Sequence, residues 1–378
     1  MVPPCRAVSR TGHPALRSKP VWQSIVKRSE RCRSSPSPRL RRVDKPTLAD
    51  VARAAGVHPG TASRALNPAL VGRISPETTA RVQQAAERLG YVPDPLGRSL
   101  RTSRTHTIGV VIPDLGNPVF APIVRGIEDQ LRERGFEPLL ASTDNSAERE
   151  RDVVGVLRTR RCDGFIVASA GRGEGVVHDL VDAGVPLVLV NRLVDGVDVS
   201  AVVSDDAVGI GAAIEHLAAL GHRRIGHIGG PLQISVSATR LAAFTNAVAS
   251  DVGGAGVIEH ATDYTIEAGR VAMTALLARE QVTAVFAAND LLAVGGYEAL
   301  AAQGLRCPDD VSVVGFNNME LTAHLNPSLS TVSMPQYEMG RTAAKLVLDR
   351  LAESDGASQT VALPTVFVPR ASTCQARA

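Results

Sequence analysis

The alternation of short apolar runs with longer helical segments, which begins near residue 107, most restricts how this chain can fold. Consecutive strands joined by helices lie parallel, because each helix returns the chain to the same end of the sheet. The region holds about 270 residues, which exceeds one such sheet, so we expect two Rossmann-like α/β lobes. Strands are expected at 108–112, 138–142, 164–168, 187–190, 201–203, 224–228, 257–260, 284–287 and 311–316, and helices at 121–134, 147–160, 209–220, 238–250, 266–279 and 291–303.

Three short helices are expected ahead of these lobes, within residues 46–93. Thr47 is a suitable N-cap for the first helix, and Gly56 ends it. The second helix begins near Pro59, and the third follows a cap at Ser75. A helix, a glycine turn and a second helix within about 20 residues form a helix-turn-helix, whose second helix enters the major groove of DNA. An ordinary three-helix bundle is the alternative.

The charge of the chain is unevenly distributed. The 378 residues carry a formal net charge of only +3. Residues 1–46 hold twelve basic and two acidic residues, which gives +10, and residues 47–107 carry +4. The remainder therefore carries −11. A basic N-terminal region followed by an acidic remainder indicates a polyanionic partner at the N-terminal end.

The first 45 residues are rich in Arg, Ser and Pro and show no apolar periodicity, so we expect them to be disordered. They do not resemble a secretory signal, because no apolar segment follows the basic start. Three interpretations stay open. The segment is a DNA-associating basic tail, a transit-like peptide, or the product of a misassigned translation start, since Val43 lies just before the first helix.

The helix-turn-helix segment resembles the lactose-repressor (LacI/GalR) family of bacterial transcription regulators. The resemblance is carried by TLADVARAAGV at 47–57 and TASRALN at 61–67, and ISPET at 74–78 and LGYVP at 89–93 continue it. It extends over residues 46–370. It implies a sequence-specific DNA-binding regulator that acts as a repressor, whose effector domain is similar to periplasmic binding proteins and binds a small sugar-like effector. The family also implies a homodimer on a pseudo-palindromic operator in double-stranded DNA.

By this resemblance, Thr47, Thr61 and Ser63 contact phosphates, while positions 59, 60 and 64 face base edges. The chain departs from the family at His58, where a serine cap is usual, and Pro59 and Gly60 replace side chains that often read bases. We therefore expect Arg64 and His58 to carry more of the readout. The expected DNA-contacting residues are Thr47, His58, Pro59, Gly60, Thr61, Ser63, Arg64, Asn67, Arg98 and Leu100.

Residues 94–105 join the helices to the lobes. One interpretation is a flexible basic linker, because an isolated helix this short is unstable in water. The other interpretation is a hinge helix that folds only when the protein binds DNA. In the family a leucine at the position of Leu100 wedges between base steps in the minor groove, and Arg98 lies beside it in this chain.

Polar side chains follow several of the expected strands, at the edge where ligands bind in open α/β sheets. Aromatic residues are only 3% of the chain, so a pocket must be lined mostly by aliphatic and polar groups. Short amides and carboxylates suit a ligand with several hydroxyl groups, although each can instead cap a loop. In the family, an arginine and an aspartate are the residues that most clearly contact the ligand, and they align with Arg240 and Asp290. By the same resemblance, Phe120 and Tyr264 would form apolar walls of the ligand pocket. The expected effector-binding residues are Asp114, Asn117, Phe120, Asn191, Arg192, Arg240, Tyr264, Asn289, Asp290 and Asn317.

Other chemistry finds little support. The five cysteines have no CxxC spacing. His216, His222 and His227 could suggest a metal site, but residues 221–227 match a helix-to-strand turn of the family, so no metal or other cofactor is expected. No phosphate-binding GKS/T loop or GxSxG elbow occurs, so an enzyme is not expected. No apolar run reaches the roughly 18 residues that span a bilayer, and a cytoplasmic protein is expected.

The expected organisation has five parts. A basic extension (1–45) precedes the helix-turn-helix domain (46–93) and a hinge (94–105), and an effector-binding and dimerisation domain (106–370) ends in a tail (371–378). The tail lacks apolar heptads, which favours a dimer over a tetramer. The alternative function is a solute-binding protein without a DNA role, which would need an export signal and would not need residues 46–105.

Overall fold

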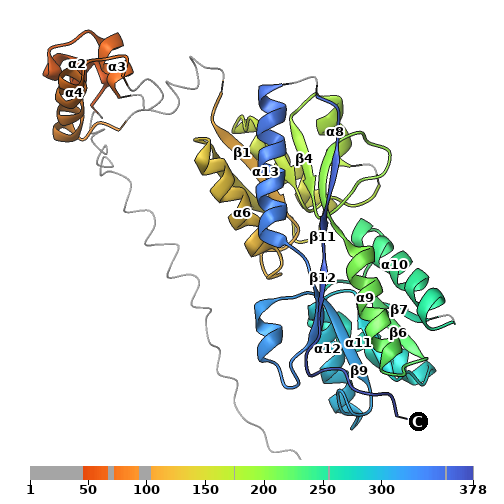
Figure 1. The fold of residues 1–378 in the computed structure, drawn as a ribbon. Coiled ribbons are helices and arrows are strands. Elements are labelled where there is room, and N and C mark those ends of the chain that lie inside the picture. The colour runs from red at the N-terminus through yellow and green to blue at the C-terminus, as the bar shows by residue number, and fades with distance from the viewer. Residues whose placement is uncertain are drawn as a thin grey trace, which may run out of the picture. The chain divides into compact units, whose positions relative to one another are not determined.

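The computed structural model describes residues 46–66, 72–92, 104–173, 175–253, 256–353 and 356–377. The chain divides into two compact units, Met1–Asp94 and Pro95–Ala378 (Figure 1). The expected extension at 1–45 and all but two residues of the expected hinge at 94–105 lie outside the described residues.

In the smaller unit, the described residues 46–66 and 72–92 form three helices around a small apolar core. Thr47 and Asp50 form a reciprocal capping box at the first helix, and Gly56 ends this helix with a φ of 64°. Val51 and Val82 are completely buried where the helices meet. The expected helix-turn-helix is therefore present. Its helices are α2 (Leu48–Ala55), α3 (Pro59–Ala65) and α4 (Pro76–Leu89).

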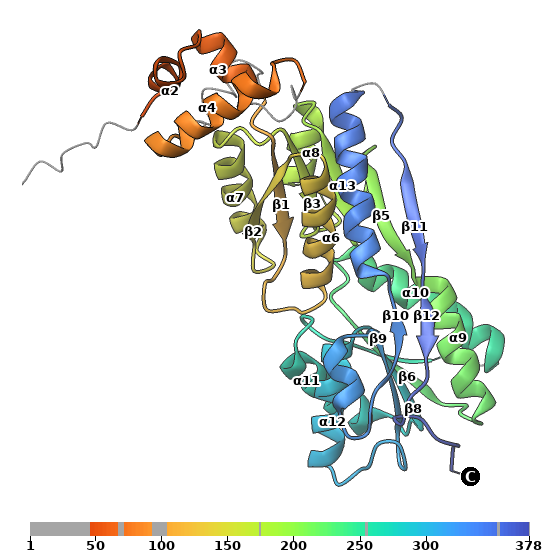
Figure 2. The same ribbon diagram turned by 60° about the vertical axis from the view of Figure 1, so that its left-hand side comes forward.

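The larger unit has two lobes, each a six-stranded sheet covered by helices on both faces, which confirms the expected fold class (Figure 2). In the first lobe the strand order is β11-β5-β4-β3-β1-β2, with all pairs parallel. Its elements are β1 (Thr107–Ile112), α6 (Phe120–Glu133), β2 (Glu137–Ser142), α7 (Ala147–Thr159), β3 (Gly164–Val167), α8 (Val176–Asp182), β4 (Leu187–Val190), β5 (Ser200–Asp205), α13 (Gln336–Ala352) and β11 (Thr360–Pro364).

The second lobe repeats this arrangement with the order β12-β10-β9-β8-β6-β7, in which only the β10–β12 pair is antiparallel. Its elements are α9 (Asp206–Ala219), β6 (Ile225–Gly229), α10 (Ser235–Asp251), β7 (Val257–His260), α11 (Ile266–Arg279), β8 (Ala284–Ala287), α12 (Asp290–Ala302), β9 (Ser312–Asn317), a 3-10 helix (Glu320–His324), β10 (Ser330–Ser333) and β12 (Val366–Val368).

Successive side chains of the central strands are buried on opposite faces of the sheet, which explains why helices cover both faces. On β1, Ile108 and Val110 pack into the core shared with α6 and α13, while Val111 packs into the core shared with α7 and α8. Successive side chains of a strand point to opposite faces, so a strand that is apolar throughout requires helices on both sides.

The chain crosses between the lobes three times, from β5 to α9, from β10 to α13 and from β11 to β12. Figure 2 shows β11 and β12 as one continuous ribbon that runs from the first sheet to the second. The hydroxyl of Thr365 donates to the carbonyl of Asp205 at 2.7 Å and so joins two of these crossings. No element was expected after residue 316, so α13, β10, β11 and β12 differ from the expectation, and α8 within the first lobe was not expected either.

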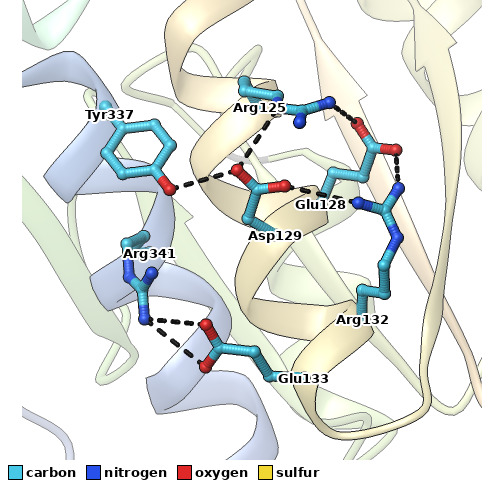
Figure 3. A network of polar contacts seen from close by, with 7 residues as sticks. All are labelled: Arg125, Glu128, Asp129, Arg132, Glu133, Tyr337 and Arg341. Atoms are coloured by element: carbon cyan, nitrogen blue, oxygen red, sulfur yellow. Dashed lines mark hydrogen bonds and ion pairs between the residues drawn. The ribbon is translucent and has the colours of Figure 1, made fainter.

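Helix α13 is held against α6 by a close backbone approach and by polar contacts (Figure 3). A Cβ atom added to Gly126 would lie 2.0 Å from the carbonyl oxygen of Tyr337, so only glycine permits this crossing. The hydroxyl of Tyr337 donates to Asp129 at 3.1 Å, and Arg341 pairs with Glu133 at 3.3 Å. The second segment to cross between the lobes is therefore fixed to the first lobe at its first helical turns.

Residues 371–377, which belong to the expected tail, pack on the second lobe. Ser372 is completely buried, and its hydroxyl donates to the carbonyl of Val313 at 2.6 Å. The amide of Ala376 donates to the carbonyl of Leu220 at 2.8 Å. Residues 371–377 therefore belong structurally to the effector domain.

Candidate effector cleft and DNA-binding surface

A cavity that is open to solvent lies between the two lobes. Nine of the ten expected effector-binding residues line it, from the ends of strands in both lobes and from α6, α10 and the loop before α11. Asp290 is the expected residue that does not line it. The lining residues are Pro113, Asp114, Asn117, Val119, Phe120, Asn145, Asn191, Arg192, Val236, Arg240, Asp263, Tyr264, Asn289 and Asn317.

Asn191 and Arg192, which follow β4, bring buried and unsatisfied polar atoms to this cavity. The guanidinium of Arg192 donates to the carbonyl of Ser169 at 2.8 Å and to the side-chain oxygen of Asn145 at 3.1 Å. Its Nε and the side-chain oxygen of Asn191 are buried and have no hydrogen-bond partner among the described residues. Burial lowers the pKa of Arg192 to about 10, which leaves it charged at neutral pH.

Arg240, on α10, is held on three sides. Its Nε lies 3.0 Å from Asp206 Oδ2, and its Nη1 donates to the carbonyl of Ala288 at 2.6 Å. Its Cζ atom lies 3.7 Å from the centroid of the Phe316 ring, a cation–π geometry. Asp206 also accepts from the hydroxyl of Ser204 at 2.5 Å. The ion pair neutralises Arg240 and fixes its orientation at the cavity wall.

Asp290 lies behind the cavity and has no exposed surface, which differs from the sequence expectation. Its carboxylate accepts from the amide of Met319 at 2.7 Å and from the hydroxyl of Thr331 at 2.6 Å. It therefore ties the loop after β9 to β10. Its neighbour Asn289 lines the cavity, and the side-chain oxygen of Asn289 caps α12 by accepting from Leu292 at 2.8 Å.

Several lining residues also have local roles, which agrees with the alternative that strand-end polar groups cap loops. Asp114 accepts from the amide of Gly116 at 2.7 Å, and Asn117 accepts from the amide of Val119 at 3.2 Å. The hydroxyl of Tyr264 shares a hydrogen bond of 2.7 Å with Ser237. These three side chains are positioned before any ligand arrives.

The structure adds five residues to the lining of the cavity, namely Pro113, Val119, Asn145, Val236 and Asp263. Asn145 lies three residues beyond the end of β2, so the same strand-end rule that selected Asn191 could have found it. Asp263 lies three residues beyond the end of β7, so the same rule could have found it as well. Val236 is the second residue of α10, and no local pattern distinguishes it.

Of the expected base-reading residues, His58 caps α3, Pro59 and Gly60 begin it, and Arg64 lies in its last turn with a side chain that reaches back to the carbonyl of Gly60. His58, Pro59 and Arg64 are exposed. Nδ1 of His58 accepts from the amide of Gly60 at 3.1 Å and so caps the helix, as a serine would. Thr47 is exposed, and Thr61 and Ser63 are half-buried. Asn67, Arg98 and Leu100 lie outside the described residues.

Neither a metal site nor a membrane span is found in the described part of the chain. It contains no cluster of three or more His, Cys, Asp or Glu side chains suited to a metal ion. None of its helices is long and apolar enough to cross a bilayer. His216, His222 and His227 have separate hydrogen-bond partners, namely Thr373, Thr283 together with the carbonyl of Cys374, and the carbonyl of Phe286.

Comparison with known proteins matches both units. Residues 47–94 match the family described as bacterial regulatory proteins, lacI family, and residues 214–373 match the periplasmic binding protein-like domain. The transcriptional repressor CytR of Escherichia coli (strain K12) is 33% identical over 312 residues, which cover 81% of this chain and 89% of CytR.

Two solved structures share the fold over nearly their whole length. The transcriptional regulator CelR in complex with cellobiose is 34% identical, with a TM-score of 0.66, over 86% of this chain and 99% of that one. A lac repressor dimer bound to its operator and an anti-inducer is 25% identical, with a TM-score of 0.77, over 87% of this chain and 99% of that one. The chain belongs to the lacI family of bacterial regulatory proteins and is a DNA-binding transcriptional regulator.

Proposed function

We propose that this protein is a repressor whose affinity for its operator is controlled by a small sugar-like effector bound between the two lobes. The observation that carries the effector class is the pair of unsatisfied atoms after β4. Asn191 offers a buried acceptor, and Arg192 offers a buried donor. A hydroxyl group both donates and accepts, so a polyol satisfies both atoms, whereas an apolar ligand would leave them unpaired.

The relatives support this class of effector and this mode of DNA binding. CelR was solved with cellobiose, and the lac repressor was solved as a dimer on its operator. We infer that this chain acts as a homodimer on a pseudo-palindromic operator, because a two-fold symmetric protein presents two identical reading helices to two half-sites.

The connection between the sites follows from the three crossings. An effector that contacts residues of both lobes, such as Arg192 in the first and Arg240 in the second, favours one relative arrangement of the lobes over another. An effector shifts this equilibrium only by the difference between its affinities for the two arrangements. Operator binding that prefers one arrangement is then coupled to effector binding by the same free energy.

Within this proposal the residues have distinct roles. The nine expected residues that line the cavity contact the effector, and Asp290 supports them from behind. The expected residues of α2, α3 and the 94–105 segment contact DNA. We assign no catalytic step or cofactor to the protein and place its action in the cytoplasm, where its DNA target lies.

Thermal unfolding of the full-length protein against a panel of monosaccharides and disaccharides tests the effector. A ligand present at 100 times its Kd stabilises the folded state by about 2.7 kcal/mol, so a true effector raises Tm clearly. Arg192→Met keeps the apolar volume of the side chain but removes the donors, and should abolish the rise. Arg172→Met is the matched control, because Arg172 pairs with Asp195 outside the cavity lining.

Fluorescence anisotropy with labelled DNA from upstream of the protein's own gene tests the coupling. The sugar identified above should change the affinity of the wild type for this DNA at constant salt. Arg64→Ala should lose the DNA preference and keep the Tm rise. Sugar binding without salt-sensitive DNA binding would instead identify a solute-binding protein, and DNA binding that no sugar alters would contradict the proposed effector.

A further inference from the structure

The start of α3 presents an unusual surface for a reading helix. Pro59 has no backbone N–H, and Gly60 has no side chain, so neither position offers a hydrogen-bonding group beyond a backbone carbonyl and the amide of Gly60. That amide is already donated to His58. The exposed donors at this end of the helix are therefore the side chains of His58 and Arg64.

The capping hydrogen bond determines which nitrogen of His58 carries the proton. Nδ1 accepts from the amide of Gly60 at 3.1 Å, so Nδ1 is unprotonated in this arrangement. In a neutral imidazole the other nitrogen then bears the hydrogen. Nε2–H is thus a donor on an exposed ring whose orientation is fixed by the cap.

Arg64 lies beside this ring with most of its donors available. Its Nε donates to the carbonyl of Gly60 at 3.0 Å, which fixes the side chain along the helix. Its two terminal nitrogens make no hydrogen bond or ion pair with any residue in the described ranges. A Cβ atom on residue 60 would lie 3.2 Å from Nδ1 of His58 and 3.9 Å from Nη2 of Arg64.

Gly60 therefore leaves room for both side chains to meet above its backbone. Because Nδ1 of His58 and Nη2 of Arg64 lie within 4 Å of one point, the imidazole and the guanidinium lie side by side. Side chains placed in this way can contact base pairs that are neighbours in the stack. A guanidinium with two free terminal nitrogens fits the O6 and N7 of guanine. A single fixed N–H donor fits the N7 acceptor of a purine at the adjacent base pair.

We propose that His58 is a base-reading residue as well as a helix cap, and that its Nε2–H selects a purine next to the guanine read by Arg64. This inference rests on the proposed DNA-binding function. It assigns base specificity to His58, whose hydrogen bond to the amide of Gly60 caps the helix. It also explains the glycine at residue 60, because a side chain there would crowd the imidazole.

Selection from a random double-stranded DNA library with the full-length protein tests this proposal. Binding to every single-base variant of the enriched sequence then gives a preference at each position. The wild type should show a guanine with an adjacent purine in each half-site. His58→Ser keeps a capping oxygen but removes the reaching donor. It should reduce the purine preference at that one position by roughly two- to tenfold and leave the neighbouring guanine preference unchanged.

Two further variants separate readout from stability. Arg64→Ala should remove the guanine preference and keep the purine preference. Gly60→Ala should improve the intrinsic helix propensity of α3 and yet weaken the purine preference, because its methyl group displaces the imidazole.

The outcomes distinguish the two proposals. If the wild type enriches a sequence but His58→Ser lowers affinity equally for all sequences, or leaves every preference unchanged, His58 is only a cap and this inference is overturned. If the wild type enriches no sequence at all, the proposed DNA-binding function fails, and the inference fails with it.

Discussion

Arg240 and Asp206 form an ion pair in which Nε and Oδ2 are 3.0 Å apart and the side chains are only 3% and 2% exposed. Asp206 is the first residue of α9, immediately after the first crossing from β5, and Arg240 lines the cavity from α10. The pair therefore joins the start of the second lobe to the cavity wall. An arginine buried in this way keeps its orientation only while its partner remains.

Removal of the aspartate should be costly. Asp206→Ala leaves a buried cation without its partner and should reduce the free energy of unfolding by about 3–5 kcal/mol. Asp195→Ala is the control, because its pair with Arg172 is 41% and 62% exposed and should contribute at most ~1 kcal/mol. Urea unfolding followed by circular dichroism measures both. Equal losses for the two variants would contradict the importance of burial.

The crossing of α6 and α13 predicts opposite effects for two glycine substitutions. Gly126→Ala places a methyl group 2.0 Å from the carbonyl oxygen of Tyr337 and should destabilise the fold by roughly 1–3 kcal/mol. Gly155→Ala on α7, where a Cβ meets nothing within 4 Å, should stabilise it by about 0.5–1 kcal/mol. The Tm values of the two variants should move in opposite directions, and shifts of the same sign would exclude this packing.

His227 predicts a loss of stability in acid. Its ring stacks on Phe244 and Phe286 with centroids 4.7 and 5.6 Å away, and burial lowers its pKa to about 4. In the unfolded chain the imidazole has a pKa of about 6.5, so between pH 6.5 and 4 the unfolded state is protonated while the folded state is not. The contribution of His227 to the free energy of unfolding is therefore complete above pH 6.5 and falls between pH 6.5 and 4. His227→Phe should lose less Tm on acidification than the wild type does. His324→Phe, at an exposed site, should follow the wild type, and an unchanged slope in His227→Phe would contradict the assignment.

Asp290 predicts the opposite pH dependence. Burial raises the pKa of its carboxyl group from 3.8 to about 7. The folded state then holds a proton that the unfolded chain releases, so this contribution to stability is present below pH 3.8 and is lost as the pH rises through 7. Asp290→Asn keeps one oxygen that can accept from the amide of Met319, its NH2 group can donate to the hydroxyl of Thr331, and it cannot titrate. The Tm of the wild type minus that of Asp290→Asn should fall between pH 5 and 8, and a constant difference would refute the raised pKa.

The alternation of strand and helix patterns was sufficient for the fold class, because an apolar strand with helices on both sides of it in the chain has few ways to be buried. The positions of Asn191 and Asn289 in the cavity followed from the same logic, since they come directly after parallel strands. The segments after residue 316 were missed. Strands β11 and β12 have exposed residues and pair with strands distant in sequence, so no local periodicity marks them.

Local patterns and chain order are enough to specify two α/β lobes, a helix-turn-helix with its caps, and the strand ends at which polar residues gather. Only the tertiary structure decided which of two adjacent side chains, Asn289 or Asp290, lines the cavity. It also paired Arg240 with Asp206 and left Asn191 and Arg192 with unsatisfied atoms. The reason is physical: the partner of a buried polar group is chosen by the segments that pack around it, and these are distant in the chain.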